Sequence, residues 1–461
     1  MGLKAVVLGA GKGTRMKSDL AKVLHEVAGR PLVSWMLEIV AASGIDETVV
    51  VVGHQADEVA AVLPEGVRTA LQEKQLGTGH AARVGLEALD PDDDDIVLVL
   101  PGDMPLIRHE TLEHLVELHR GTGAGATLLS CRPADPTGYG RILRDGADHV
   151  LGIVEQRDAS DQQLAIREVS TSVYAFAARH LRPALADLSN DNSQGEYYLT
   201  DVIAAFVADG LRVEALGADA IEGEGVNSHD QLAAAAAELR RRINRSWMRS
   251  GVWMQDPERT YIDADVTLAP GVRLYADVHL EGATAIDADA EVGPSVYVRD
   301  CRIGAGARIW YSVLRQADVG IQAEVGPYVS LRPGADLREG SKAGTFVEIK
   351  NSVVGKDSKV PHLAYVGDAT IGEGSNIGAG TITVNYDGHQ KHRTMIGDGV
   401  KIGSDTMLVA PVSVGDDAWT AAGSVITKDV SPGALAVARS PQKEVPGYAA
   451  RRRARAEQEQ P

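Results

Sequence analysis

Aliphatic side chains recur every six residues through much of the second half of the chain, and this period constrains the fold more than any other feature. The step runs without a slip through Ile396, Ile402, Leu408, Val414, Thr420 and Ile426. Six residues match neither the 3.6-residue turn of a helix nor the two-residue alternation of a single strand. The period predicts a solenoid, a prism whose flat sides are short strands with one inward aliphatic side chain per side.

The period starts near Val266, and one extra residue shifts its frame at Ile303. A break at residues 383–396, around Asn385 and Tyr386, predicts a loop expelled from the coil, and such insertions are often functional. After about Pro446 the apolar pattern is lost, so we expect the tail at 451–461 to be frayed.

The first half alternates apolar runs with amphipathic segments. The runs at 5–8, 48–52, 96–100 and 126–130 predict buried strands, and the segments at 31–42, 56–63, 79–89 and 109–119 predict helices. This alternation predicts a mostly parallel sheet with helices on both faces. The stretch 231–248 has no Pro or Gly and predicts one long helix. We therefore expect domains at 1–228 and 251–461, joined by a linker helix at 229–250.

Length and composition narrow the function classes. At 461 residues the chain is too long for one ordinary domain. Its net charge of −18 argues against nucleic acid or an anionic membrane as the main partner. No apolar run approaches the roughly 20 residues that span a bilayer, and no signal peptide is apparent. Cys131 and Cys301, without metal-type spacing, predict two buried thiols in a reducing, cytoplasmic setting.

A glycine-rich loop follows the first apolar run. Gly9, Gly11 and Gly13 let backbone N–H groups approach an oligophosphate closely, while Arg15 and Lys22 supply cations that match phosphate oxygens. The loop is neither a Walker loop nor the dinucleotide fingerprint. It predicts a phosphate site, although alone it is also compatible with a purely structural turn.

Asp103 ends the most apolar run of the first half. An aspartate at the carboxyl end of a strand is suited to Mg²⁺, which bridges phosphates with only one or two protein oxygens. A helix N-cap is the alternative role for this residue.

Several further motifs stand in a fixed order along the first half. They are Asp19-Leu20-Ala21-Lys22, Gln72, Gln75-Leu76-Gly77-Thr78-Gly79-His80, Gly102-Asp103-Met104-Pro105, Tyr139-Gly140-Arg141 and Glu155. With the glycine loop they resemble sugar-1-phosphate nucleotidyltransferases. Nearly the whole chain resembles the bacterial bifunctional N-acetylglucosamine-1-phosphate uridyltransferase/glucosamine-1-phosphate N-acetyltransferase family. The resemblance implies a Rossmann-like first domain, a left-handed parallel β-helix of hexapeptide repeats and a homotrimer. It also implies UTP and acetyl-CoA as co-substrates, with Mg²⁺ for uridyl transfer.

The resemblance also implies residue roles. Asp103 and Asn227 would hold Mg²⁺. The nucleotide and its sugar product would be bound by Leu8, Gly9, Ala10, Gly11, Gly13, Arg15, Lys22, Gln72, Gly77, Thr78, Gly140, Glu155, Ser170 and Asn227. The family usually has Asn-Thr-Gly or Asn-Ser-Gly where this chain has Ser170-Thr171-Ser172. Ser170 keeps a hydroxyl but has a shorter reach and no amide donor.

The second half matches the acetyltransferase half of the same family. His362 is the expected general base, because imidazole titrates near neutral pH, and Glu348 would orient it. The amino-sugar phosphate would be bound by Arg332, Lys350, Tyr365, Asn376, Asn385, Tyr386 and Lys391. Acetyl-CoA would be bound by Ala379, Asn385, Tyr386, Ser404, Ala422 and Arg439, and the charge of Lys443 suggests that it joins them.

Two alternatives remain open from the sequence. The solenoid could be a structural or regulatory rod attached to a single-activity nucleotidyltransferase, but a rod has no need of His362, Asn385-Tyr386 or Arg439. It could also be a hexapeptide-repeat metal enzyme such as a carbonic anhydrase. That interpretation needs several metal-spaced histidines on adjacent coils, and only His362 is well placed. His389 and His392 lack a third ligand, so we expect them to be solvated loop residues.

Overall fold

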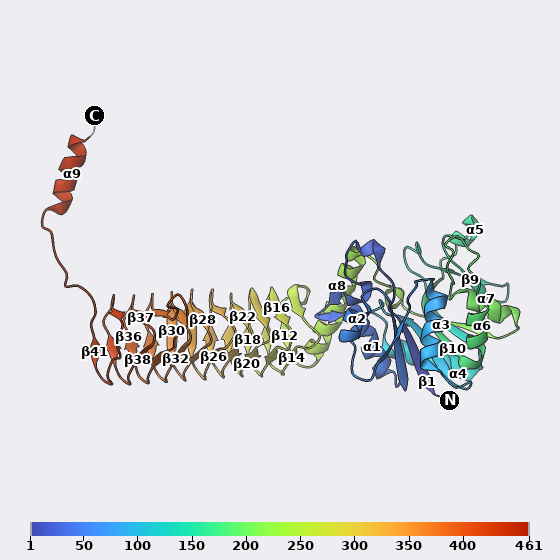
Figure 1. The fold of residues 1–461 in the computed structure, drawn as a ribbon, viewed down its shortest axis with the longest axis horizontal. Helices are drawn as coiled ribbons and strands as arrows, with labels where there is room; N and C mark the ends of the chain where they lie inside the picture. Colours follow the sequence, from blue (N-terminus) through green and yellow to red (C-terminus); the bar gives the residue numbers. More distant parts are fainter. Residues whose placement is uncertain (1, 460–461) are drawn as a thin grey trace. The chain divides into compact units, whose positions relative to one another are not determined.

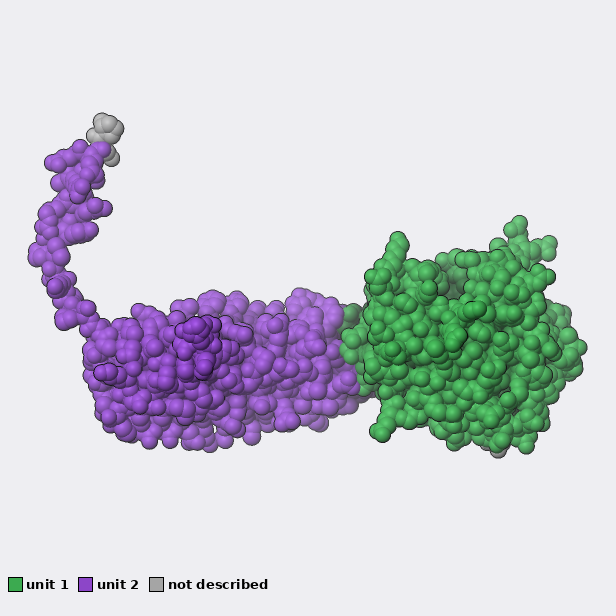
Figure 2. Space-filling view, in the orientation of Figure 1, with its two compact units in different colours: residues 1–243 green, residues 244–461 purple. Residues whose placement is uncertain are grey.

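The computed structural model describes residues 2–459, which form two compact units (Figure 2). The first unit ends at Ile243 and the second begins at Asn244, so the division falls inside helix α8 (His229–Arg249). The domain limits at 228 and 251 stay predictions, because a division by compactness does not show where either half folds alone.

The first unit is an α/β structure whose main elements follow the predicted alternation (Figure 1). Before α8, its α-helices are α1 (Leu32–Ala42), α2 (Ala56–Ala61), α3 (Thr78–Leu89), α4 (His109–Thr122), α5 (Asp161–Leu164), α6 (Ala178–Ala186) and α7 (Asp201–Ala208). Its main-sheet strands are β1 (Leu3–Leu8), β4 (Glu47–Val52), β5 (Arg68–Leu71), β6 (Ile96–Pro101), β7 (Ala126–Cys131), β8 (Arg141–Arg144), β9 (Val150–Val154), β10 (Val169–Ala177) and β11 (Val213–Gly217).

The sheet is mixed, with the central order β11-β7-β10-β6-β1-β4-β5. β6, β1, β4 and β5 are parallel, as the alternation predicts. β10, which the sequence pattern did not reveal, runs antiparallel between β6 and β7. The carboxyl ends of β1 and β6 therefore lie side by side and place the glycine loop next to Asp103.

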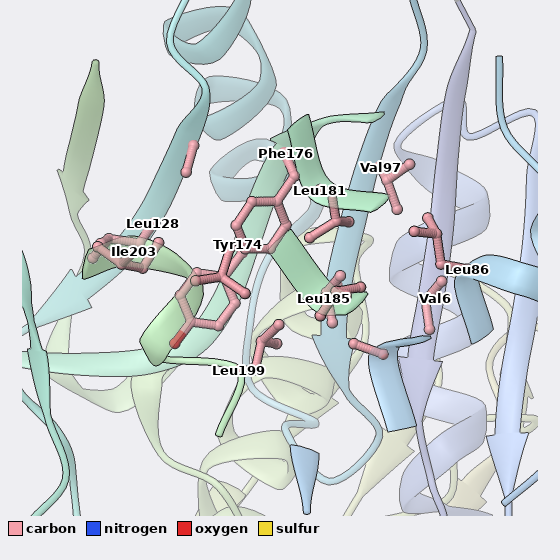
Figure 3. Packing of buried hydrophobic residues seen from close by; sticks show 14 of the residues in the cluster. Val6, Leu86, Val97, Leu128, Tyr174, Phe176, Leu181, Leu185, Leu199 and Ile203 are labelled. Carbon is pink, nitrogen blue, oxygen red and sulfur yellow. The ribbon is translucent and has the colours of Figure 1, made fainter. Parts of the chain in front are cut away.

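Alternate side chains of the strands enter two separate cores on opposite faces of the sheet. Val6, Val97 and Tyr174 belong to one cluster of buried side chains with residues of α3, α6 and α7 on one face, and Figure 3 labels all three within it. Ala5 and Leu98 pack with residues of α1 and α4 on the other face. Burial on both faces explains why the parallel strands read as continuous apolar runs.

The second unit is a prism of three parallel sheets, with one strand from each coil in each sheet (Figure 1). We call its faces by their first strands. The β12 face holds β12 (Trp253–Met254), β15 (Arg273–Leu274), β18 (Glu291–Val292), β21 (Arg308–Ile309), β24 (Glu324–Val325), β27 (Lys342–Thr345), β30 (Lys359–His362), β33 (Asn376–Ile377), β36 (Lys401–Ile402), β39 (Trp419–Thr420) and β41 (Leu435–Ala436).

The β13 face holds β13 (Thr260–Ile262), β16 (Val278–Glu281), β19 (Val296–Arg299), β22 (Val313–Arg315), β25 (Ser330–Leu331), β28 (Glu348–Lys350), β31 (Tyr365–Gly367), β34 (Ile382–Val384), β37 (Met407–Val409) and β40 (Val425–Ile426). The β14 face holds β14 (Thr267–Leu268), β17 (Ala285–Ile286), β20 (Arg302–Ile303), β23 (Asp318–Val319), β26 (Ala335–Leu337), β29 (Ser352–Val354), β32 (Ala369–Ile371), β35 (Thr394–Ile396) and β38 (Val412–Val414). This architecture is consistent with a left-handed parallel β-helix.

Three six-residue sides make one coil, since Arg273 pairs with Glu291 on the next coil. The residues of the six-residue period are buried, as predicted, but many sides bury a second residue two positions away, such as Val278 and Leu280. The frame change near Ile303 has a different cause from the predicted one. Ala285 pairs with Arg302, so this coil is one residue short and carries no extra residue.

The prism turns its corners with left-handed residues. Many are Asp or Asn, which tolerate positive φ better than other non-glycine residues. Three successive coils instead place Tyr311, Tyr328 and Phe346 at such a corner, with φ between 47° and 59°. Their rings contact one another in sequence, at centroid distances of 5.9 and 5.3 Å. Bulky side chains in this conformation are strained and rarely kept without a use.

The tail differs from the expectation of a frayed end. Residues Tyr448–Gln458 form helix α9, all of whose side chains are exposed, while residues 460–461 lie outside the described part of the chain. Its Ala, Arg, Glu and Gln residues have high helix propensity, and this favours a helix even where no apolar face is buried.

The sequence predicts that both cysteines are buried thiols, and the structure confirms this. Cys131 and Cys301 are free and buried, and burial raises the pKa of each thiol to about 11. Of the helices in residues 2–459, none combines the length and the apolar character needed to cross a bilayer.

The inward-facing side chains of the coils, which we call the inward column, predict which mutations lower the stability of the second unit. Ile303→Ala removes a buried side chain of β20 and should lower the unfolding free energy of the second unit by about 2–5 kcal/mol. Arg302→Ala, the exposed neighbour on the same strand, should change it by less than about 0.5 kcal/mol. Chemical denaturation followed by circular dichroism measures both, and equal effects would contradict the inward assignment.

Candidate active sites

A cavity of about 630 Å³ opens at the carboxyl ends of β1 and β6. Its wall combines the glycine loop, the start of α3 and the segment before α8. Most residues predicted for the nucleotide site line it, namely Leu8, Gly9, Ala10, Gly11, Arg15, Lys22, Gln72, Gly77, Thr78, Asp103 and Asn227.

Two glycines of the cavity region meet requirements that other residues cannot. Gly13 has φ 63°, and a Cβ there would lie 2.7 Å from Cβ of Lys22, so the loop can fold over the lysine only without a side chain. Gly77 has φ 107°, and a Cβ would lie 2.6 Å from the carbonyl oxygen of Tyr197. Gly13 therefore shapes the loop from behind and is not among the lining residues.

Asp103 and Asn227 meet despite their distance in sequence. The backbone N–H of Val226 donates to the carbonyl oxygen of Asp103 at 2.9 Å, which draws the two segments together. Lys22 Nζ lies 2.5 Å from Asp103 Oδ2 and 3.1 Å from Asn227 Oδ1, and Arg15 Nη2 donates to the same amide oxygen at 2.8 Å. Two oxygens from separate segments thus face one cationic position.

The predicted sugar residues Gly140, Glu155 and Ser170 lie together but outside the cavity lining. The N–H of Ser170 donates to the carbonyl oxygen of Gly140 at 2.9 Å, and Thr200 Oγ1 donates to Glu155 Oε1 at 3.1 Å. Burial raises the pKa of Glu155. Their neighbours Gly138, Tyr139, Thr171 and Ser172 form the lining in this region.

Ser170 has an internal partner that the sequence did not reveal. Its hydroxyl lies 3.0 Å from the phenol oxygen of fully buried Tyr174, across an irregularity in β10. Ser172 occupies the left-handed region with φ 63°. Ser170 is thus buried outside the cavity lining, whereas Thr171 and Ser172 line the cavity.

A second cluster surrounds Asp368, which lies at the corner between the β13 and β14 faces. Its buried carboxylate accepts hydrogen bonds from Asn351 Nδ2 at 2.6 Å, Asn385 Nδ2 at 2.5 Å and Lys350 Nζ at 3.3 Å. Burial alone would raise the pKa of Asp368, but these three hydrogen bonds outweigh it and lower the pKa below its ordinary value.

The other predicted amino-sugar residues extend this cluster. Tyr365 and Asn385 are 3.5 Å apart at their polar atoms, and Arg332 Nη1 donates to Glu348 Oε1 at 2.8 Å. The Lys350 ammonium lowers the pKa of neighbouring Lys391. The result is a cationic surface with one buried counter-ion, which suits a phosphate monoester.

The expected base and acyl-donor residues form a regular row. Leu363, Gly380, Asp405 and Gly423 are left-handed corner residues of four successive coils. The residues immediately before them are His362, Ala379, Ser404 and Ala422. These four side chains therefore stack at one corner, between the β12 and β13 faces, and Arg439 Cδ lies 4.0 Å from the position of a Cβ on Gly423. A row along a corner offers an extended contact for a long donor.

The residues predicted to bind the amino sugar do not all lie on the same face of the prism within one chain. Asn376 lies on the β12 face, between Lys359 and Lys401, whereas Lys350 and Tyr365 lie on the β13 face. In the expelled loop, Tyr386 is exposed and donates to the carbonyl oxygen of Gly388.

Of the two loop histidines, His389 is exposed and His392 is half-buried, with its Nε2 2.7 Å from Asp387 Oδ2. Within residues 2–459 no three His, Cys, Asp or Glu side chains gather as a metal-binding group.

Sequence reasoning missed Asp368, Asn351 and Tyr174. Asp368 and Asn351 are left-handed corner residues, and an Asp or Asn at a corner of this prism signals only a turn. Tyr174 sits in an apolar strand, where a tyrosine usually indicates core packing. Spacing alone carried no signal for their polar contacts.

The cluster predicts a pH-dependent stability. Asp368→Asn should destabilise the second unit at pH 7 by about 3 kcal/mol, since it removes the charge that pairs with Lys350. The folded-state pKa is lowered, so the stabilisation is complete above the unfolded value near 3.8 and is lost as pH falls through the folded value. The gap between the melting temperatures of variant and parent should therefore close as the pH falls through the folded-state pKa of Asp368.

Asp357→Asn is the matched control, because Asp357 is an exposed corner residue with a similar φ of 57°. A gap between the melting temperatures that is as large below the folded-state pKa as at pH 7, or an equal effect of the control, would contradict the role of Asp368.

Comparisons with known proteins identify the family of the chain. Residues 5–204 match the MobA-like NTP transferase domain family. The chain is 50% identical over 453 residues to the "Bifunctional protein GlmU" of Streptomyces avermitilis, covering 97% of this chain and 94% of that protein. It is 51% identical over 447 residues to the protein of the same name from Kineococcus radiotolerans, covering 96% and 91%. For that of Pelobacter propionicus the values are 47% over 448 residues, covering 96% and 97%. The chain therefore belongs to the GlmU family of bifunctional enzymes, which make UDP-N-acetylglucosamine by acetyl transfer and uridyl transfer.

Proposed function

We propose that the two reactions are divided between the two units, with uridyl transfer in the cavity of the first and acetyl transfer along the corner row of the second. The observation that carries this division is the convergence of Asp103 and Asn227 on one cationic position beside the glycine loop. No comparable pair of acceptors faces the His362 row among the contacts of the described residues.

Uridyl transfer joins the phosphate oxygen of N-acetylglucosamine-1-phosphate to the α-phosphorus of UTP, while the bond to pyrophosphate breaks. No covalent nucleophile is required, so positioning and charge neutralisation supply the rate. Backbone N–H groups around Gly11 and the side chains of Arg15 and Lys22 face the position for the triphosphate. Gln72 and Thr78 line the part of the cavity assigned to the nucleoside.

The donor set fits a hard divalent cation, which we propose to be Mg²⁺. Asp103 offers a carboxylate oxygen and Asn227 an amide oxygen, and both already bind a cationic group in the structure. Mg²⁺ typically takes one or two protein oxygens and completes its shell with phosphate and water. When bound, it would neutralise charge on the phosphates. Asp103 and Asn227 would hold it.

Acetyl transfer forms an amide from the 2-amine of glucosamine-1-phosphate and the acetyl group of acetyl-CoA, releasing the thiol of CoA. His362 accepts the proton that the attacking amine loses. The cationic surface of Arg332, Lys350 and Lys391 binds the sugar phosphate, and Asn385 and Tyr365 orient the sugar. Ser404, Ala422 and Arg439 extend from His362 along the acyl donor.

We also propose that the protein is a homotrimer that packs through its β13 faces. On each face, the residues that pair between neighbouring coils and point outward form a row along the prism, which we call the ladder of that face. On the β12 face charges alternate along Arg273, Glu291, Arg308, Glu324 and Lys342. On the β13 face the ladder is largely apolar and consists of Tyr261, His279, Tyr297, Val313, Ser330, Glu348, Tyr365, Ile382, Met407 and Val425. The exposed corner of Tyr328 and Phe346 borders the same face.

The two halves of the acetyl site flank this apolar face. The His362 row lies at its corner with the β12 face, and the Asp368 cluster lies at its corner with the β14 face. Copies that pack face to face bring one corner of each chain beside the other corner of its neighbour. This arrangement supports an acetyl site shared between copies, with closed symmetry burying the apolar ladders.

Reciprocal variants test the division. Asp103→Ala should abolish pyrophosphate release and leave acetyl transfer nearly intact, because it removes only the metal carboxylate. His362→Ala should lower acetyl transfer by roughly 10²–10⁴-fold and spare uridyl transfer when N-acetylglucosamine-1-phosphate is supplied. Separate assays of pyrophosphate and free CoA measure both. If either folded variant loses both activities equally, the division is wrong.

Charge on the apolar face tests the trimer. Val313→Glu should convert a native trimer to monomer and remove acetyl transfer while uridyl transfer persists. Thr267→Glu places the same charge on the exposed β14 face and should leave the trimer intact. Native mass spectrometry and sedimentation give the mass. A fully active monomeric parent protein would overturn the proposal.

A further inference from the structure

The proposed metal position is filled by a side chain of the protein itself. Lys22 Nζ lies 2.5 Å from Asp103 Oδ2 and 3.1 Å from Asn227 Oδ1, which are the two oxygens proposed to hold Mg²⁺. The side chains of Lys22 and Asp103 are 19% and 10% exposed, so the pair is poorly screened by water.

The root of Lys22 is fixed on the loop side of the cavity. Its stem passes under Gly13, where a Cβ would lie 2.7 Å from the lysine Cβ. The preceding residue, Ala21, is held by a hydrogen bond from its N–H to Gln55 Oε1 at 2.6 Å. Only the flexible end of the Lys22 side chain is therefore able to move between the Asp103 side of the cavity and its glycine-loop side.

A divalent ion and the Lys22 ammonium compete for the same oxygen, Asp103 Oδ2. Metal–oxygen distances for Mg²⁺ are about 2.0–2.1 Å, and a second cation at hydrogen-bonding distance from the same oxygen would be strongly repelled at the low effective dielectric of a half-buried site. The metal therefore has to displace Lys22. The displaced ammonium stays in the cavity, beside the loop that faces the triphosphate.

We propose that Lys22 is an exchangeable internal cation that occupies the metal position in the empty site and leaves it when metal and nucleotide enter together. This inference rests on the proposed metal role of Asp103 and Asn227. It makes metal binding to the nucleotide-free site weak, because the metal has to break the ion pair with Asp103. A triphosphate offsets that loss by giving the lysine a new anionic partner.

The test uses Mn²⁺ as the probe and measures its affinity for the full-length, nucleotide-free protein by electron paramagnetic resonance. Lys22→Met should bind Mn²⁺ about ten-fold tighter, or more, than the parent protein, since the competing cation is gone. Lys22→Gln is a second neutral variant with the same expected result. A melting curve establishes that each is folded.

Lys12→Met is the matched control for a general loss of positive charge. Lys12 lies in the same loop and lines the same cavity, but it is exposed, and within residues 2–459 no hydrogen bond or ion pair joins it to Asp103. It should change Mn²⁺ affinity less than about two-fold. If Lys22→Met and Lys22→Gln bind Mn²⁺ no more tightly than the parent, or no more tightly than Lys12→Met, the exchange is wrong.

The double variant Lys22→Met with Asp103→Asn separates this inference from the proposed metal site. It should lose the tight Mn²⁺ binding of Lys22→Met. Retained tight binding would show that the metal is held elsewhere, which removes the proposed site. Lost binding in Asp103→Asn, together with unchanged affinity in Lys22→Met, would keep the site and overturn only the exchange.

Discussion

Coil-on-coil stacking is the constraint on which the second unit depends. Each short strand pairs with strands of the neighbouring coils, and the inward side chains are buried inside the stack that these coils form. The inward positions are therefore fixed, and the outward positions are free to vary. The alternating charges of the β12 face and the apolar ladder of the β13 face are two uses of that freedom.

The first unit solves a different problem, which is to bring distant segments to one edge of a sheet. Parallel β1 and β6 end side by side, and the bond from Val226 to Asp103 adds a segment from the end of the unit. Acceptors and cations thus meet at positions that sequence distance would not suggest. The cavity depends on this convergence more than on any single loop.

The parts of the fold that could be predicted have strong local patterns. The six-residue period identified the inward column, and apolar runs identified the parallel strands. β10 was missed because its buried antiparallel residues lack flanking turn signals, and α9 because helix propensity alone sustains it. For the cavity of the first unit, the order of the motifs carried the family resemblance, and that resemblance predicted most of the lining residues. Asp368 and Tyr174 act through contacts across coils or across a bulge, and those depend on register, which a single sequence does not display.

The four residues His362, Ala379, Ser404 and Ala422 lie on successive coils, so the spacing between neighbouring strands sets the distances along the proposed acetyl site. Neighbouring strands of a sheet lie about 4.8 Å apart, so each coil moves the next contact by one such step. A coil added before Ile309 would lengthen the prism and leave the row unchanged. A coil added between His362 and Ser404 would shift the proposed base by one step from the proposed donor contacts, so under this proposal the number of coils there matters as much as the side chains.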